Sequence, residues 1–165
     1  MQYMKLDTTE RHALLAGLSA MPAYLGETYS RLSAVQAAEP GPDGAFAPVE
    51  QVWHLADLER EGFGMRIERL LSGCGPHLPD FDGAALAAAR NYRTLSLAAG
   101  LEAFASARAH NIATLQAIES PETWAQSGTQ EGVGRVSLCD MPGFMSQHDA
   151  AHRAEIEEWK SRVAQ

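Results

Sequence analysis

The sequence predicts an all-α fold, a four-helix bundle in which residues 1–165 form a single domain. Alanine, the best helix former, occupies 28 of the 165 positions, whereas valine and isoleucine, which favour strands, together occupy only 10. Four long segments carry apolar residues at helical spacing, and stretches rich in proline or glycine separate them. A chain of this length buries about 70% of the surface that its unfolded form exposes, so it folds without a disulfide or a structural metal.

The first helix is expected over residues 8–38. Asp7 and Glu10 stand at its start with the spacing of a capping box, in which two side chains satisfy the first backbone donors of a helix. Pro22 lies inside the apolar pattern that follows. Because proline has no backbone donor and clashes with the preceding turn, the helix is expected to kink or restart there.

Three more helices complete the expected bundle, over residues 48–72, 84–119 and 140–163. Pro48 suits the first turn of the second helix, and glycines end that helix after position 72. The third helix combines an alanine-rich stretch with a long apolar stripe. The fourth starts near Asp140 and carries a proline in its first turn.

A glycine-rich segment, residues 127–138, separates the third helix from the fourth. Its three glycines, Gly128, Gly132 and Gly134, indicate a loop or a short ribbon. The segment lacks the Lys-Ser/Thr ending of a phosphate-binding loop, and no strand of a βαβ unit precedes it. The sequence leaves two interpretations, a flexible loop beside a site and a plain connector.

The charge and the cysteines exclude several classes of protein. Thirteen lysines and arginines against 21 acidic residues give a net charge of −8, with no basic run, so we expect no nucleic-acid partner. The apolar runs are too short to cross a bilayer, and residues 1–5 do not resemble a secretory signal. Cys74 and Cys139 form no C-x-x-C pair. A cytoplasmic protein without membrane contact is therefore expected.

His148 and His152 lie four residues apart on the last expected helix, a spacing that stacks the two imidazoles on one face. Met141, Met145 and Ile156 fall on the same face, so the pair is expected to point into the bundle. Two buried imidazoles need partners, because an unpaired buried polar group costs about 1–3 kcal/mol. A shared metal ion would satisfy both rings, and so would hydrogen bonds from neighbouring groups.

Glu155 shares the face of the histidine pair. It is a candidate for a fourth ligand, for an acceptor that fixes a histidine tautomer, for an acid–base group, or for a solvated carboxylate. Asp149 is expected to face elsewhere, as a solvated charge. Three further histidines are isolated in the sequence and receive no role: His12, His77 and His110.

His54 is the third candidate ligand, on the second expected helix. It lies off the main apolar stripe of that helix, on a side that it shares with Leu58, Glu61 and Met65. A bundle helix touches two neighbours, so both sides can be covered, and periodicity alone does not place His54 in the interior. Glu61 is the second candidate for acid–base chemistry, because it shares this side with His54.

Two short segments resemble the DinB/YfiT-like superfamily: VWHLADLE at residues 52–59 and HDAAHRAE at residues 148–155. Members of that superfamily are four-helix bundles with one histidine on the second helix and an H-x-x-x-H pair on the last. The resemblance follows the order and length of nearly the whole chain. It implies that His54, His148 and His152 bind one divalent metal ion, nickel or zinc, with water in the remaining positions.

The superfamily is functionally mixed, so the resemblance supports a metal site more firmly than any substrate. Some relatives are transferases or isomerases that use a low-molecular-weight thiol, which favours thiol transfer to a small electrophile here. Metal-dependent hydrolysis is an alternative, because the ion could activate water. A non-catalytic helical module that dimerises or binds a partner is the other. A homodimer is expected.

Overall fold

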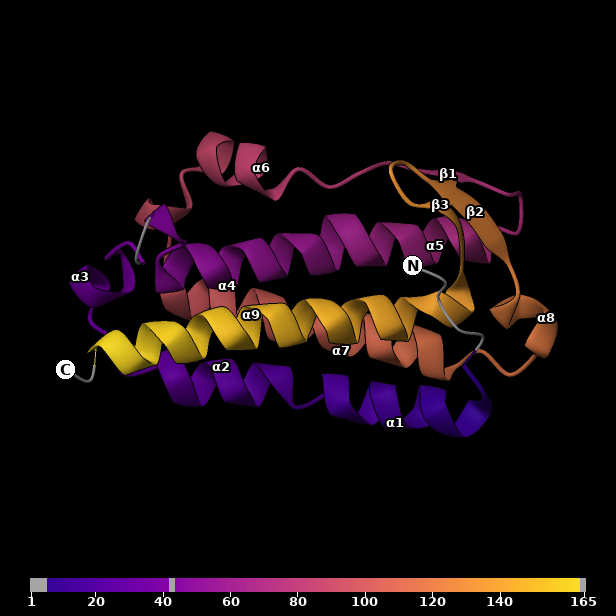
Figure 1. Ribbon diagram of the computed structural model, residues 1–165, viewed down its shortest axis with the longest axis horizontal. Helices are drawn as coiled ribbons and strands as arrows, with labels where there is room; N and C mark the ends of the chain where they lie inside the picture. Colours follow the sequence, from indigo (N-terminus) through magenta and orange to yellow (C-terminus); the bar gives the residue numbers. More distant parts are fainter. Residues whose placement is uncertain (1–5, 42–43, 164–165) are drawn as a thin grey trace.

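The computed structural model describes residues 6–41 and 44–163, except for the side chain of Val163. Residues 1–5, on which the expectation about a secretory signal rests, lie outside this part. Four helical stretches lie side by side, which confirms the predicted all-α bundle (Figure 1). These are α1 (Thr8–Leu18) with α2 (Met21–Tyr29); α4 (Pro48–Asp57), η2 (Leu58–Gly64) and α5 (Met65–Leu71); α7 (Leu97–Gln116); and α9 (Met141–Val163).

The first stretch restarts at Pro22, as predicted, but it ends earlier than residue 38. Pro22 occupies the first turn of α2, where a missing backbone donor costs nothing. α2 ends at Tyr29, and a separate turn, α3 (Ala34–Ala37), begins at the capping box of Ser33. The prediction of helix up to residue 38 is therefore wrong, because Ser33 starts a new helix instead of extending the old one.

The second stretch runs without a break over residues 48–71, as predicted, but its middle part is a π-helix. In η2 the backbone hydrogen bonds span five residues instead of four, so the segment takes up one more residue than a regular helix of the same length. Each residue of an α-helix turns by about 100°, so this extra residue rotates α5 by about 100° relative to a regular continuation of α4.

The third stretch is two helices rather than the single helix predicted over 84–119. α6 (Gly83–Arg90) ends at Asn91, whose φ of 48° is left-handed and cannot continue a helix. A 3₁₀ turn, η3 (Tyr92–Thr94), follows, and Ser96 caps the start of α7. Figure 1 shows α6 as a strap outside the bundle, beside α4. The fourth prediction is confirmed, because α9 spans nearly all of 140–163.

The glycine-rich segment forms a hairpin at one end of the bundle. β2 (Ser127–Gln130) pairs antiparallel with β3 (Gly134–Ser137), and β1 (His77–Leu78) pairs parallel with β2. Gly132 and Gly134 have φ of 72° and 102°, values that favour glycine at the turn. Val136 is fully buried in the core beneath the hairpin. The predicted short ribbon is thus present, as a cover of the core.

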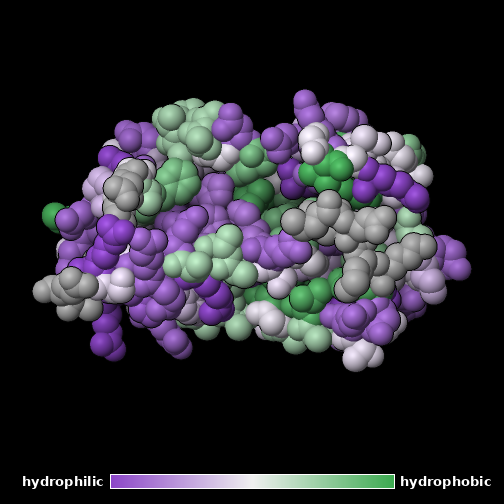
Figure 2. Space-filling view, in the orientation of Figure 1, coloured by the Kyte–Doolittle hydropathy of each residue, from purple (hydrophilic) through white to green (hydrophobic). Residues whose placement is uncertain are grey.

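Among the described residues the apolar core has two large clusters, one around α1, α5 and the start of α9, the other around α2, α4 and the end of α9. A small third cluster consists of Ala37, Ala47 and Val49. α4 packs against α7, and α1 packs against α9. Figure 2 shows hydrophilic side chains over the end of the molecule where α9 ends, while hydrophobic side chains form separate patches. No helix in the described part of the chain is both long and apolar enough to cross a membrane.

Candidate metal centre

α9 places His148 and His152 one turn apart, on the face that the sequence predicts to be internal. Met141, Met145 and Ile156 on this face are fully buried, and His152 is 7% exposed. The two Nε2 atoms lie 3.1 Å apart. Two nitrogens that each bind one zinc ion at about 2.0–2.1 Å lie about 3.3 Å apart in a tetrahedral site, so the observed separation fits a shared ion.

α4 brings His54 to the same point. Its ring centroid lies 5.6 Å from that of His148 and 5.1 Å from that of His152. One nitrogen from each of the three rings can be chosen so that all lie within 4.8 Å of one another. The three histidines that the superfamily resemblance selected therefore converge, from two helices that are distant in the sequence.

Gly83, the first residue of α6, packs directly on the His54 ring. A Cβ atom at this position would lie 2.4 Å from Cε1 and 2.5 Å from Nδ1 of His54, closer than atoms approach without a bond. Only glycine lets the strap lie this close without moving the ring. The strap thereby closes one side of the cluster and limits the positions open to His54.

Gln51 and Glu155 fix the tautomer of His152. The Gln51 Nε2 atom donates a hydrogen bond of 2.7 Å to Glu155, so Gln51 Oε1 faces the histidine. His152 Nδ1 donates to this oxygen over 2.6 Å and lies 3.2 Å from Glu155 Oε2. With its proton on Nδ1, His152 offers the lone pair of Nε2 toward His148. Of the roles considered for Glu155, the geometry matches the acceptor that fixes a tautomer.

All three imidazoles are neutral near pH 7. Burial, together with the nearby His152, lowers the pKa of His54 to about 4 and that of His148 to about 3. Burial also lowers the pKa of His152, against the opposing charge of Glu155. Neutral rings keep the lone pairs that a metal needs.

Two of the rings have buried nitrogens that no group of the described residues satisfies. Nδ1 of His54 and Nδ1 of His148 are buried without a hydrogen-bond partner, and the His54 ring forms no hydrogen bond with any described residue. Leaving a buried polar atom unpaired costs about 1–3 kcal/mol, and such atoms are rare in folded proteins. An ion held by the Nε2 atoms of His148 and His152 would not pair with Nδ1 of His148, so the fit to a metal ion rests on the convergence of three neutral imidazoles and on the separation of these two Nε2 atoms.

Three phenylalanine rings surround the cluster. Phe46 and Phe81 lie 5.5 Å and 6.0 Å from the His54 ring, and Phe63 packs edge-on against His148 at 5.9 Å. Apolar walls around a few polar groups are typical of small-molecule sites. These residues come from separate segments, and nothing in their sequence spacing marks them as neighbours of the histidines.

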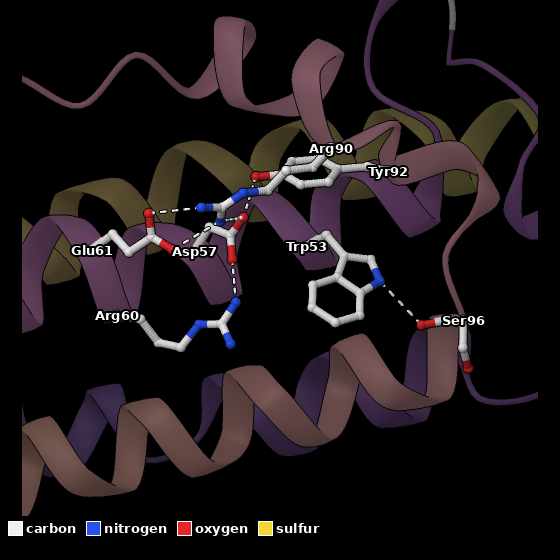
Figure 3. A network of polar contacts seen from close by, with 7 residues as sticks. All are labelled: Trp53, Asp57, Arg60, Glu61, Arg90, Tyr92 and Ser96. Carbon is white, nitrogen blue, oxygen red and sulfur yellow. Dashed lines mark hydrogen bonds and ion pairs between the residues drawn. The ribbon is translucent and has the colours of Figure 1, made fainter.

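Glu61 points away from the cluster, toward the strap. It pairs with Arg90 of α6 through two hydrogen bonds of 2.8 and 3.0 Å, as Figure 3 shows. The expectation that it shares a side with His54 assumes a regular helix. The π-helical segment changes the rotation of the residues within and after it, so Glu61 reaches Arg90 instead.

Asp57 anchors the same network beneath Glu61. The Asp57 carboxylate is buried and accepts hydrogen bonds from Tyr92, Arg90 and Arg60 (Figure 3). Burial alone would raise the pKa of Asp57, but these three donors outweigh it and hold the pKa below its ordinary value. Trp53 adds a hydrogen bond of 3.1 Å to the Ser96 carbonyl. The network attaches the strap, α6, to α4 through Arg90 and Asp57. This attachment holds Gly83 against the His54 ring.

Asp149 is not a solvated charge, contrary to expectation. It is 7% exposed and forms two hydrogen bonds, of 2.7 and 2.8 Å, with the buried guanidinium of Arg108. Arg108 also donates to Glu59 and to the Leu18 carbonyl, and Asn111 donates twice to Glu59. We call Glu59, Arg108 and Asp149 the Arg108 cluster. It joins η2, α7 and α9 beside the histidines, through partners too distant in the sequence for periodicity to reveal.

The other candidates lie elsewhere. His12, His77 and His110 are exposed and separate. Cys74 is exposed, and Cys139 is buried with its Sγ near the Leu6 carbonyl. A cavity of about 760 Å³ opens between η2, α5 and α7, and the three clustered histidines do not line it.

The comparisons with known proteins agree with this architecture. A sequence profile of the DinB superfamily matches residues 17–156. No curated protein matches the chain significantly. Among solved structures, the YfiT protein of Bacillus subtilis superposes with a TM-score of 0.87 at 19% identity, over 96% of this chain and 90% of that one. YfiT is described as a probable metal-dependent hydrolase with an unusual four-helix bundle topology. At this identity the likeness shows the fold.

Proposed function

The chain belongs to the DinB superfamily, and we propose that it is an enzyme dependent on a divalent metal ion held by His54, His148 and His152. One observation carries this proposal: the rings of three neutral histidines converge, with one nitrogen from each lying within 4.8 Å of the others and the Nε2 atoms of His148 and His152 only 3.1 Å apart. Three neutral protein ligands are the donor set of catalytic sites, which keep a position open, whereas structural sites are closed by four.

An ion in this donor set supplies Lewis acidity, which lowers the pKa of a bound water or thiol toward neutrality. Imidazole nitrogens suit nickel and zinc, the two ions that we propose. Gln51 and Glu155 hold the His152 ring so that Nε2 remains unprotonated and correctly turned. Glu155 is therefore proposed as a positioning residue rather than as an acid–base catalyst.

Hydrolysis is the reaction that we place first. The fold relative YfiT is described as a probable metal-dependent hydrolase, which supports a water-activating site here. Phe46, Phe63 and Phe81 would surround the substrate and limit the access of bulk water. Glu61 is engaged by Arg90, so this carboxylate is not placed to accept a proton at the cluster.

Transfer of a low-molecular-weight thiol to a small electrophile is the second candidate. Neither cysteine of the chain is placed at the histidines, because Cys139 contacts the Leu6 carbonyl and Cys74 contacts the Ser72 carbonyl. A sulfur nucleophile would therefore come from a cosubstrate. A neutral donor set leaves the full charge of the ion to stabilise a thiolate.

Elemental analysis and activity assays test both candidates. Wild type, His152→Ala and the exposed-histidine control His12→Ala are loaded with nickel or zinc, and their metal content is measured. Each protein is then assayed with a panel of esters and amides, and with bacterial thiols plus electrophiles. We expect metal and turnover in wild type and in His12→Ala, and neither in His152→Ala.

The panels separate the reaction classes. Turnover without a thiol supports hydrolysis, and turnover only with a thiol supports transfer. Metal-loaded wild type that is inactive in both panels would favour the non-catalytic module, and full metal occupancy in His152→Ala would reject the site itself. Sedimentation of the same proteins tests the proposed homodimer.

A further inference from the structure

Arg66, on α5, is a buried cation without an anionic partner. It is 6% exposed, yet no carboxylate of the described residues forms an ion pair with it. Its Nε atom is buried without a partner, and its one hydrogen bond, from Nη2 to the Pro79 carbonyl, is long at 3.4 Å. Burial lowers the pKa of Arg66, and the charge of Asp80 opposes this only in part. Arginine stays protonated in proteins, so a buried positive charge is held here with only partial compensation from Asp80.

The guanidinium of Arg66 lies beside the histidine cluster. Its Cζ is 5.9 Å from the centre of the Phe63 ring, and the same ring lies 5.9 Å from the His148 ring. The charge of Arg66 contributes to lowering the pKa of His148, after burial, the other two histidines and Arg108. The segment that accepts its hydrogen bond also carries Phe81, which contacts His54. Arg66 is thus one aromatic ring away from the candidate metal ligands.

The π-helical segment η2 is what brings Arg66 to this side. In a regular helix, a residue 12 positions after His54 would be turned about 120° away from it. The extra residue in η2 reduces this rotation to about 20°, so Arg66 takes the side that a regular helix would give to Met65. π-helical insertions are frequent at functional sites, and this one replaces an apolar side chain by a cation beside the histidines.

We propose that Arg66 binds the carboxylate of a small organic acid whose apolar body contacts Phe63 and Phe81 and whose reacting group faces the three histidines. The inference deepens the proposed function. Binding of the carboxylate to Arg66 does not depend on that function, whereas the reaction of the substrate at the three histidines does. A planar guanidinium matches a carboxylate, to which it can donate two parallel hydrogen bonds. Arg66 is 6% exposed and lies near the Phe63 ring, and a buried setting strengthens such a pair.

Titration calorimetry with three probes tests the proposal: benzoate, its uncharged analogue benzamide, and phenyl phosphate. The protein is first stripped of metal, so that no probe can bind to an ion and the result does not depend on the metal site. Wild type is compared with Arg66→Met, Arg66→Lys and Arg69→Met. Arg69 is a matched control, because it lies on the same helix and is exposed. It donates a hydrogen bond of 2.8 Å to the His77 carbonyl, two residues before the carbonyl that Arg66 contacts.

Benzoate is expected to bind wild type and Arg69→Met equally, and at least about tenfold more tightly than benzamide, as befits hydrogen bonds to a charged group. Arg66→Met should lose this preference, and Arg66→Lys should keep part of it. Arg66→Met should also melt at a higher temperature than wild type, because it removes a buried charge that forms no ion pair with the described residues. This shift shows that the variant is folded.

Three results would overturn the proposal: equal affinity of wild type and Arg66→Met for benzoate, no preference of wild type for benzoate over benzamide, or tighter binding of phenyl phosphate than of benzoate. A fall in the melting temperature of Arg66→Met with unchanged benzoate affinity would identify Arg66 as a structural residue instead. Failure of the protein to take up metal would reject the proposed function but would leave these binding results unchanged.

Discussion

The histidine cluster and the Arg108 cluster lie in the same bundle and share one helix, α9, yet their polar atoms are satisfied very differently. Arg108 donates four hydrogen bonds of 2.7–3.1 Å to Glu59, Asp149 and the Leu18 carbonyl. Of the three histidine rings, only that of His152 has hydrogen-bond partners outside the cluster, and the His54 ring has none among the described residues. Asp149 is the direct neighbour of His148 in the chain, so the contrast arises within one helical turn.

This difference indicates that the Arg108 cluster stabilises the fold, whereas the histidine cluster is suited to binding a ligand. Arg108 pairs with both carboxylates of its cluster, Asn111 and the Leu18 carbonyl complete the hydrogen bonds, and no buried side-chain atom of the cluster is left unpaired, so it joins three helices without a bound ligand. The histidine cluster and Arg66 instead retain binding capacity that the fold does not use, with lone pairs on one side and a cation on the other. Such groups reduce stability, and they persist where a ligand uses them.

Removal of Arg108 should have the largest effect on stability. Arg108→Met leaves Glu59 and Asp149 buried without their partner, so the free energy of unfolding is expected to fall by about 3–5 kcal/mol. Urea denaturation followed by circular dichroism measures this change. The exposed control Arg31→Met should stay within about 0.5 kcal/mol of wild type. A loss of less than about 1 kcal/mol in Arg108→Met would contradict the structural role of the cluster.

Loss of one ligand should remove the stabilisation by metal. At a free metal concentration of one hundred times Kd, binding stabilises wild type by about 2.7 kcal/mol. His148→Ala leaves two protein ligands, so added zinc or nickel should no longer raise its melting temperature. Differential scanning calorimetry with and without metal measures the shift. An equal metal-induced shift in His148→Ala and wild type would exclude His148 as a ligand.

The metal-free protein should become less stable as the pH falls. His54 and His148 titrate at about 4 and 3 in the folded chain and near 6.5 when unfolded, so between these values only the unfolded chain takes up their protons. Stability is therefore full above about pH 6.5 and declines below it, by about 2 kcal/mol for each of the two histidines between pH 7 and pH 5. Urea midpoints at both pH values test this. His148→Gln should show a smaller decline, whereas His12→Gln should match wild type.

Changes at the residues that hold His152 should have the smallest effects. Gln51→Leu removes the acceptor of the Nδ1 proton, and metal affinity is expected to fall by about 10- to 100-fold. Gln51→Glu keeps an acceptor and should bind metal more tightly than Gln51→Leu. Glu155→Gln should lower affinity least, because the Glu155 side chain is 54% exposed and lies farther from Nδ1. Competition with a chromophoric chelator gives the three affinities, and equal values would contradict the orienting role.

Helical periodicity in the sequence correctly predicted those features of the site that depend on residues within one or two helical turns. His148 and His152 are one turn apart, so helical periodicity was enough to place both rings on the internal face. Periodicity left the orientation of His54 undecided, and only the superfamily resemblance placed it with the pair. The split of the predicted helix over 84–119 follows from Asn91 and Ser96, whose conformations a continuous apolar pattern conceals.

Long-range features escaped prediction for a physical reason. Asp149 resembles a surface carboxylate until Arg108, 41 residues earlier in the chain, is placed beside it. The π-helical segment has no sequence signal of its own, yet it decides that Arg66 rather than Met65 lies beside the histidines, and it directs Glu61 to Arg90. Packing against other helices determines such a segment, and no single helix contains that information.

Gly83 has a consequence for how this protein can evolve. Gly83 has no positive φ, and glycine loses more conformational freedom on folding than alanine, so selection for stability alone would favour alanine here by about 0.4–1 kcal/mol. Its contact with His54 opposes that replacement for as long as the ring position matters. Lineages that keep the three histidines should therefore keep glycine here, on an otherwise permissive surface helix. Lineages that have lost His54 should accumulate alanine, so this one position records whether an ancestor still used its metal.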